Sequence, residues 1–123
     1  MNKTEQFLRE FNEAWLREDV QTVLDGVTDD IRFRMASEKG VQGKEDFGRM
    51  LREMSGSGQG FKLTIEQVIL SGERAAVNGL IECRSPEAQK LTTYAFCDVY
   101  ELAPGSSPRV KALTAYVMEV KSD

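Results

Sequence analysis

The chain has 123 residues, of which 41% are apolar and 29% charged, and its 16 Lys and Arg against 20 Asp and Glu give a net charge of −4. This composition predicts one folded domain over residues 1–123 and argues against disorder and against a nucleic-acid-binding protein. No apolar run approaches the ~18 residues that span a membrane, and no secretory leader is evident, so no membrane partner and a cytoplasmic location are expected.

The residue types restrict the chemistry that the chain can perform. It contains no His, and its two cysteines, Cys83 and Cys97, belong to no CxxC motif. A metal site is therefore not expected, and acid–base chemistry has to rest on Asp, Glu, Tyr, Lys or Cys.

The first half of the chain is predicted to be mainly helical. Residues 4–17 place apolar side chains at spacings of three and four, which predicts a helix with Asn2 at its capping position. Asp19 is expected to cap a second, short helix. Residues 31–35 alternate as in a half-buried strand, and residues 44–54 carry the apolar stripe of a third helix.

The second half is predicted to consist of strands, with a loop over residues 55–60. The alternating runs cover residues 61–70, 74–84, 90–102 and 109–120. Ser71–Gly72 indicates a tight hairpin turn, Ser85–Pro86 a second turn, and Gly79 a bulge or sharp bend. Helices followed by antiparallel strands, with no βαβ alternation, predict an α+β domain.

Asp98 is the candidate functional residue, because it interrupts an apolar strand face. Alternation places one set of side chains together: Thr92, Tyr94, Phe96, Asp98, Tyr100 and Leu102. If this face points inward, Phe96 and Tyr100 flank Asp98 at roughly 7 Å each, and burial raises the pKa of Asp98 into a range suited to a general acid or base. The alternative is a structural acid satisfied by an Arg, a Tyr hydroxyl or a backbone N–H.

The order and spacing of these segments resemble the nuclear-transport-factor-2-like superfamily, in its SnoaL-like and ketosteroid-isomerase-like branch. The resemblance is carried by FNEAWLREDVQTVLDGVTDDIRF, GKEDFGRML, YAFCDVYEL and RVKALTAYVMEV, and it covers nearly the whole chain. It implies a cystatin-like cone, with three N-terminal helices packed on a strongly curved antiparallel sheet that encloses an apolar pocket. It implies no cofactor.

The resemblance also implies site positions. The ketosteroid isomerases use a Tyr on the first helix, a base Asp after the first strand and a neutral Asp on a late strand, which fall here on Phe11, Met35 and Asp98. Asp98 is thus the candidate catalytic residue. The residues expected to line the pocket are Trp15, Phe11, Phe33, Met35, Tyr94, Phe96 and Val117.

Two functions remain open from the sequence. The first is a cofactor-free isomerase, cyclase or dehydratase that uses Asp98 on a small apolar molecule. The second is a non-catalytic module that binds a ligand or a protein, and the absence of the Tyr, of the base Asp and of any His favours it. In either case a homodimer is expected, because Ala95, Cys97 and Val99 form an apolar strip on the second strand face that needs a cover.

Overall fold

The structure is a computed structural model, and it describes residues 2–36, 38–54, 61–84 and 91–121. The loop predicted over residues 55–60 and the turn predicted at Ser85–Pro86 lie outside the described residues.

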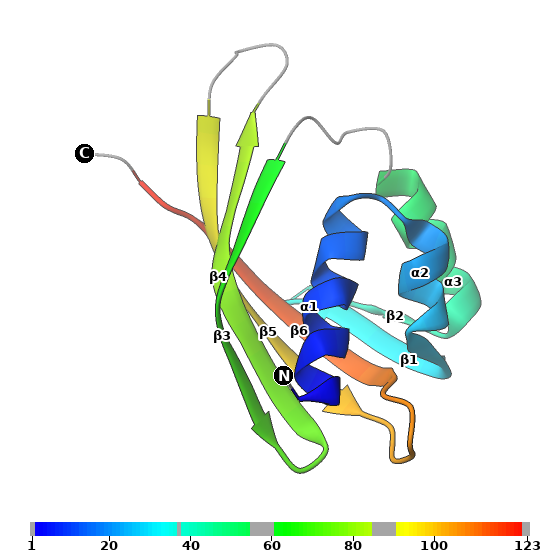
Figure 1. The fold of residues 1–123 in the computed structure, drawn as a ribbon. Coiled ribbons are helices and arrows are strands. Elements are labelled where there is room, and N and C mark those ends of the chain that lie inside the picture. Colours follow the sequence, from blue (N-terminus) through cyan, green and yellow to red (C-terminus); the bar gives the residue numbers. More distant parts are fainter. Residues whose placement is uncertain (1, 37, 55–60, 85–90, 122–123) are drawn as a thin grey trace.

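Three helices form one layer of the molecule (Figure 1). They are α1 (Lys3–Leu16), α2 (Val20–Asp25) and α3 (Lys44–Met54). The side chain of Asn2 accepts hydrogen bonds from the backbone N–H groups of Thr4 and Glu5, which satisfies two of the donors that a helix start leaves unpaired. The predicted cap of α1 is therefore confirmed.

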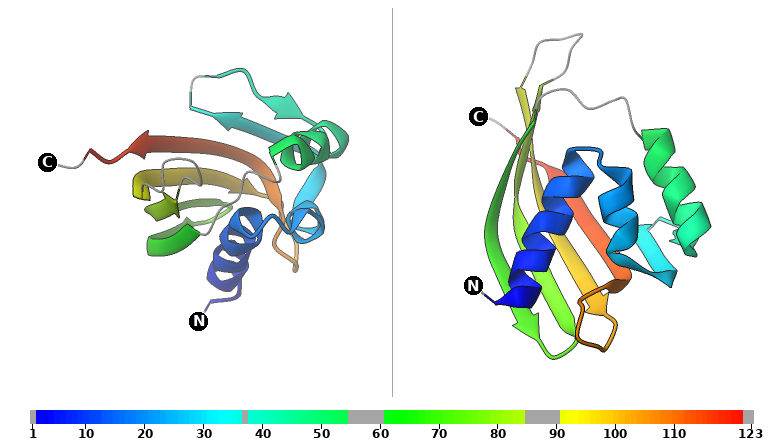
Figure 2. Two further views of the ribbon diagram at one scale, coloured as in Figure 1. Left: turned by 90° about the horizontal axis from the view of Figure 1, so that it is seen from above. Right: turned by 45° about the vertical axis from the view of Figure 1, so that its right-hand side comes forward.

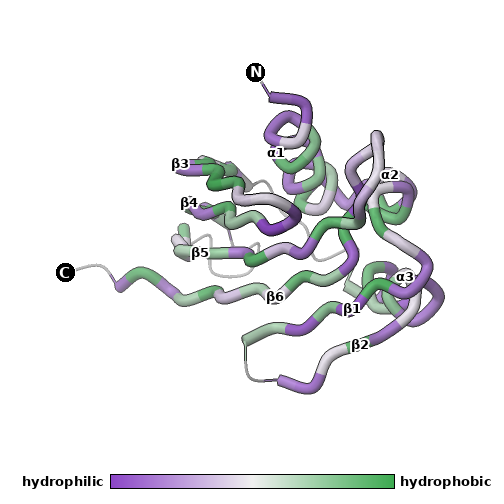
Figure 3. Tube along the Cα trace, turned by 90° about the horizontal axis from the view of Figure 1, so that it is seen from below, coloured by the Kyte–Doolittle hydropathy of each residue, from purple (hydrophilic) through white to green (hydrophobic). Residues whose placement is uncertain are grey.

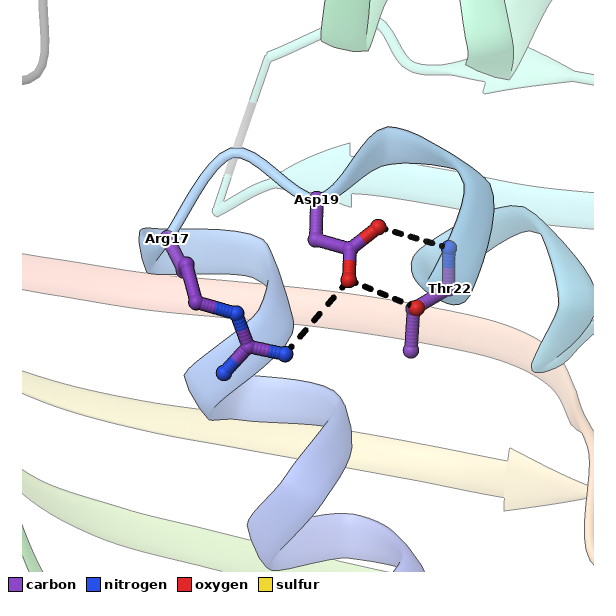
Figure 4. Close-up of polar contacts among 3 residues, drawn as sticks. All are labelled: Arg17, Asp19 and Thr22. Atoms are coloured by element: carbon purple, nitrogen blue, oxygen red, sulfur yellow. Dashed lines mark hydrogen bonds and ion pairs between the residues drawn. The ribbon is translucent and has the colours of Figure 1, made fainter.

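Asp19 caps α2 as predicted (Figure 4). Its carboxylate accepts from the backbone N–H of Thr22 at 3.2 Å and from the Thr22 hydroxyl at 2.7 Å. Arg17 lies 3.5 Å from the same carboxylate. The hydrogen bonds from Thr22, with a smaller contribution from Arg17, lower the pKa of Asp19 below its ordinary value. These contacts fix the turn between α1 and α2.

A curved six-stranded sheet forms the second layer (Figures 1 and 2). Its strands are β1 (Val27–Met35), β2 (Val41–Gln42), β3 (Phe61–Ser71), β4 (Arg74–Arg84), β5 (Leu91–Leu102) and β6 (Val110–Glu119). Their order is β2-β1-β6-β5-β4-β3. The three helices cover one face, which we call the inner face, and the opposite face is the outer face.

The curved antiparallel sheet that the sequence predicted contains one parallel pair. β1 runs parallel to β6, and every other neighbouring pair is antiparallel. Parallel neighbouring strands are never joined by a tight turn, so there is no turn motif in the sequence from which the pairing of β1 with β6 could be predicted. The two-residue strand β2 was not predicted either, because it is too short to show alternation.

The β3–β4 hairpin is built around two glycines. Ser71 pairs with Arg74, so the turn residues are Gly72 and Glu73, one position later than predicted, and Gly72 has a left-handed φ of 58°. The pairing of β3 with β4 shifts register opposite Gly79. A Cβ on Gly79 would lie 1.9 Å from the carbonyl oxygen of Thr64, so the two strands meet there more closely than any side chain permits. The irregularity predicted at Gly79 is confirmed.

The core fills the space between the helices and the inner face. Its largest fully buried side chains are Tyr100, Phe47, Leu8, Ile31, Val23, Val27, Val77 and Val110. Apolar residues recur along β3 to β6 and in the helices that cover them (Figure 3). The core thus holds α1 and α3 against the strands that carry the candidate site.

Replacing Gly79 by Ala is expected to destabilise the fold by about 2 kcal/mol or more, because β3 has to move away from the new methyl group. Urea unfolding measures the change. Gly48→Ala in α3 is the matched control: its new Cβ meets the flexible end of Arg52 at 3.2 Å, and alanine favours the helix. Equal stability of Gly79→Ala and the unmodified protein would contradict the close approach.

Candidate functional site

Asp98 lies on the inner face, in the middle of β5. The register places Val77 of β4 and Ala115 of β6 directly across from it. Phe96 and Tyr100 are its neighbours on the same face of β5, and both are buried. The sheet therefore surrounds the Asp98 carboxyl with apolar side chains and one phenol.

A chain of hydrogen bonds ties this carboxyl to helix α1. The Asn12 amide nitrogen donates to the backbone carbonyl of Leu8 and to the Tyr100 hydroxyl oxygen, both at 2.9 Å. The Tyr100 hydroxyl in turn donates to Oδ2 of Asp98 at 3.3 Å. Because Asn12 already donates to that hydroxyl oxygen, the single hydroxyl proton is directed at Asp98. Tyr100 is 1% exposed, so this chain is shielded from water.

Burial sets the proton affinity of the site. The loss of hydration raises the pKa of Asp98 to about 7, although the hydrogen bond from Tyr100 acts in the opposite direction. Among the described residues, no Lys or Arg forms an ion pair with Asp98. Burial, followed by the charge of Asp98, raises the pKa of Tyr100 well above its usual value, so the phenol stays neutral. At neutral pH Asp98 can therefore both accept and release a proton.

Three of the residues predicted to line a pocket belong to an aromatic cluster beside this chain. The Phe11 ring stands edge-on to Tyr100, with centroids 6.2 Å apart, and contacts Trp15 at 6.0 Å. Trp15 packs on Phe33 at 5.3 Å, and both rings contact Phe47 of α3. Phe11 is thus the member of this cluster that touches the residue bonded to Asp98, while Phe33 is part of the packed core.

The other predicted lining residues lie along a more open part of the inner face. The strand registers place Met35 in the same row as Asp98, two strands away, and Val117 opposite Phe96. Met35 and Val117 remain 36% and 41% exposed even though they are on the helix-covered face. Tyr94 is in the next row and is half-buried. Apolar surface next to Asp98 is therefore accessible from this side.

The sequence analysis missed the role of Asn12, and it offered a Tyr hydroxyl as a partner of Asp98 without identifying Tyr100. Asn12 follows Leu8 by one helical turn and is 9% exposed, so it is a polar residue at a core-facing position of α1. Such a residue has to find a buried partner, which is the signal that was available. Tyr100 was placed on the face of Asp98, but alternation within β5 does not show that the hydroxyl turns back to the carboxylate.

The described residues include no group of three or more His, Cys, Asp or Glu that could hold a metal ion. Cys83 and Cys97 are both free. In the register of β4 and β5, Cys83 lies across from Thr92 and Cys97 lies across from Asn78. The two thiols therefore point to opposite faces of the sheet. Within the same described part, no helix is long and apolar enough to cross a membrane.

The comparisons with known proteins give the family and the fold. The family model described as SnoaL-like domain matches residues 8–106. No curated protein matches the chain significantly.

Among solved structures, a protein named as a SnoaL-like polyketide cyclase from Shewanella denitrificans OS-217 has a TM-score of 0.79 at 16% identity, covering 94% of this chain and 90% of its own. An epoxide hydrolase from M. tuberculosis, described as LEH-like, has a TM-score of 0.76 at 20% identity and 94% and 83% coverage. A ketosteroid isomerase-like protein from Erwinia carotovora atroseptica SCRI1043 has a TM-score of 0.73 at 17% identity and 98% and 95% coverage.

At these identities the solved structures show a common fold, and the family model covers most of the chain. The helix-covered, curved and open sheet is the cone that the sequence led us to expect. The chain belongs to the SnoaL-like domain family.

Proposed function

We propose that the protein is a cofactor-free enzyme that moves a proton within a small, neutral, apolar molecule, with Asp98 as its acid–base group. The observation that carries this proposal is the Asp98 carboxyl itself, which is held by Tyr100 on an apolar face and has a pKa of about 7. A pKa near the working pH is the property that general acid–base catalysis requires.

The contacts of Asp98 indicate how it would act. Tyr100 holds Oδ2, so Oδ1 is the oxygen that remains for a substrate. The ionised carboxylate takes a proton from a carbon next to a carbonyl group, the electron pair of that C–H bond moves toward the carbonyl oxygen, and protonated Asp98 returns the proton to another atom of the same molecule. A neutral substrate fits this site, since a second negative charge beside an unpaired carboxylate is unfavourable.

Similar folds support small-molecule chemistry as a class, because the solved structures include proteins named for polyketide cyclase, ketosteroid isomerase-like and epoxide hydrolase activity.

A second candidate, a non-catalytic ligand-binding module, is favoured by Phe11 and Met35. They occupy the positions where the isomerases carry a Tyr and a base Asp. The set of catalytic residues used by those isomerases is therefore not the one proposed for this chain, in which Asp98 is the acid–base group.

Asp98→Asn is expected to lower proton transfer at least about 100-fold, because the amide neither accepts nor releases a proton in this range. The measurement is deuterium exchange at the carbon next to the carbonyl in a panel of apolar ketones in D2O, followed by NMR. Glu82→Gln is the control, since Glu82 pairs with Thr93 and therefore lies on the outer face.

Binding of an apolar fluorescent probe should stay within about 3-fold of the unmodified protein in both variants, because the apolar surface is unchanged. Exchange by the unmodified protein that persists in Asp98→Asn would remove Asp98 from the mechanism. Probe binding with no exchange on any ketone would favour the non-catalytic module.

The same carboxyl predicts a pH dependence of stability. Its folded-state pKa of about 7 lies above the ordinary value of 3.8, so the folded protein binds the proton more tightly than the unfolded chain. Between these two values stability falls as pH rises. Asp98→Asn should therefore be more stable than the unmodified protein at pH 8, by the order of 2 to 4 kcal/mol, and the difference should shrink toward pH 4. Urea unfolding across this range measures it, and a constant difference would contradict the raised pKa.

We also propose that the protein forms a homodimer through the outer face of β5 and β6. Ala95, Cys97 and Val99 face outward there, and the register adds Met118 opposite Ala95 and Tyr116 opposite Cys97. Val99, Tyr116 and Met118 are 42%, 47% and 71% exposed. An apolar patch of this kind, continuous across two central strands, is typical of an interaction surface.

Val99→Glu combined with Met118→Glu should shift the protein from dimer to monomer, because a second copy would have to bury two unpaired carboxylates. Light scattering at micromolar concentration measures the mass. Met54→Glu, at an exposed apolar position on α3, is the control and should leave the mass unchanged. A monomer for the unmodified protein would contradict the proposal.

A further inference from the structure

A second candidate binding site lies on the outer face, where β2, β1 and β6 run side by side (Figure 3). It is a groove of about 290 Å³. Its lining residues are Arg32, Phe33, Arg34, Gly40, Val41, Gln42, Ala112, Leu113 and Thr114. Arg32 and Arg34 alternate with buried Ile31 and Phe33, so the two guanidinium groups extend from the face opposite to Asp98.

The lining of this groove is positively charged. It contains two Arg and no Asp or Glu, although the chain as a whole has a net charge of −4. Asp30, on β1, is not among the lining residues; the hydrogen bond from the Thr28 hydroxyl chiefly lowers the pKa of its carboxyl, with smaller contributions from the charges of Lys111 and Arg32. The groove is therefore a basic site on an acidic protein.

The carboxylate nearest to Arg32 does not neutralise it fully. Glu101 lies 3.6 Å from Arg32, and the same carboxylate is 3.9 Å from both Arg74 and Lys111. One negative charge is thus shared by three cations. Arg32 is also more than half exposed, so its remaining N–H donors can reach a ligand.

The positive charge of Arg34 is neutralised by neighbouring carboxylates even less than that of Arg32. Its guanidinium donates to the backbone carbonyl of Ala36, and within residues 2–36, 38–54, 61–84 and 91–121 no carboxylate forms an ion pair with it. A guanidinium group carries five donors, so one carbonyl leaves most of them available. Arg34 is the residue on which an anion would depend most.

The floor and walls of the groove suit a small polar group. Arg32 stands opposite Gln42 of β2, and Arg34 opposite Thr114 of β6, which places an amide and a hydroxyl beside the two guanidinium groups. Ala112 and Gly40, which also line the groove, are small residues. Arg32 and Arg34 lie two residues apart on one strand face, at roughly 7 Å. At this spacing both guanidinium groups can contact the same small anion.

We propose that this groove binds the oxyanion group, carboxylate or phosphate, of a small molecule. Guanidinium forks match both groups in geometry and charge. The groove volume lies near the lower limit of small-ligand pockets, which are about 300 to 1,000 Å³, so the ligand is small. The groove borders the proposed dimer patch, since Thr114 pairs with Val99, and on a single copy of the chain it is exposed to solvent and screened by salt. A dissociation constant in the millimolar range is therefore expected at low ionic strength. This inference does not depend on the proposed function of Asp98.

The test is an NMR titration of the ¹⁵N-labelled full chain at low salt, with inorganic phosphate in one series and succinate in the other. We expect saturable shifts of backbone amides in β1, β2 and β6. Tighter binding of phosphate indicates a phosphate ester as ligand, and tighter binding of succinate indicates a carboxylate. Arg34→Gln should weaken binding at least about 5-fold.

Two controls make the result specific. Arg49→Gln removes an Arg of similar exposure on α3 and should leave the shifts unchanged. Asp98→Asn should also leave them unchanged, which separates this site from the one on the inner face. Shifts that do not saturate, that are equal in Arg34→Gln, or that follow only a change of molecular mass in light scattering would overturn the proposal.

Discussion

Asp98 occupies a position on the inner face where the neighbouring side chains are apolar. Placing an ionised carboxyl there costs free energy, because the group loses its hydration. Val77, Ala115 and Phe96 surround it, and no cation among the described residues compensates its charge. Among the described side chains, the Tyr100 hydroxyl provides its polar contact. A carboxyl in such surroundings meets the cost by taking up a proton near neutral pH, and this property makes the residue useful.

The orientation of that hydroxyl depends on helix α1, because Asn12 reaches Tyr100 across 88 positions of sequence separation. The docking of α1 is in turn fixed by aromatic contacts: Phe11 stands against Tyr100, and Trp15 packs on Phe33 and Phe47. The aromatic cluster thus joins α1, α3 and β1 into one body. The core and the candidate site share their residues, so the geometry around Asp98 is as rigid as the packing that stabilises the fold.

Much of this architecture could be predicted because its signals are local. The helix over residues 44–54 and the strand over residues 74–84 have long, regular patterns, and both were predicted within their observed bounds. Alternation within β5 was also sufficient to place Asp98 beside Tyr100. The pairing of β1 with β6 and the hydrogen bond from Asn12 to Tyr100 join segments that are far apart in the sequence. No local pattern in these segments indicates which distant segment each one contacts. The roles of the lining residues remain predictions, since placement on a face does not identify a ligand.

The parallel pairing of β1 with β6 has a consequence for how the protein is made. β1 emerges early from the ribosome, yet within the described residues its neighbours in the sheet are the two-residue strand β2 and β6, the last of the described strands. Until β6 has been synthesised, one edge of β1 lacks its partner and α1 has no complete surface on which to dock. Contacts of such long range slow folding and leave strand edges exposed to other chains. The sheet is therefore completed late, and a nascent chain that stalls before β6 exposes an unpaired edge of β1 to other chains.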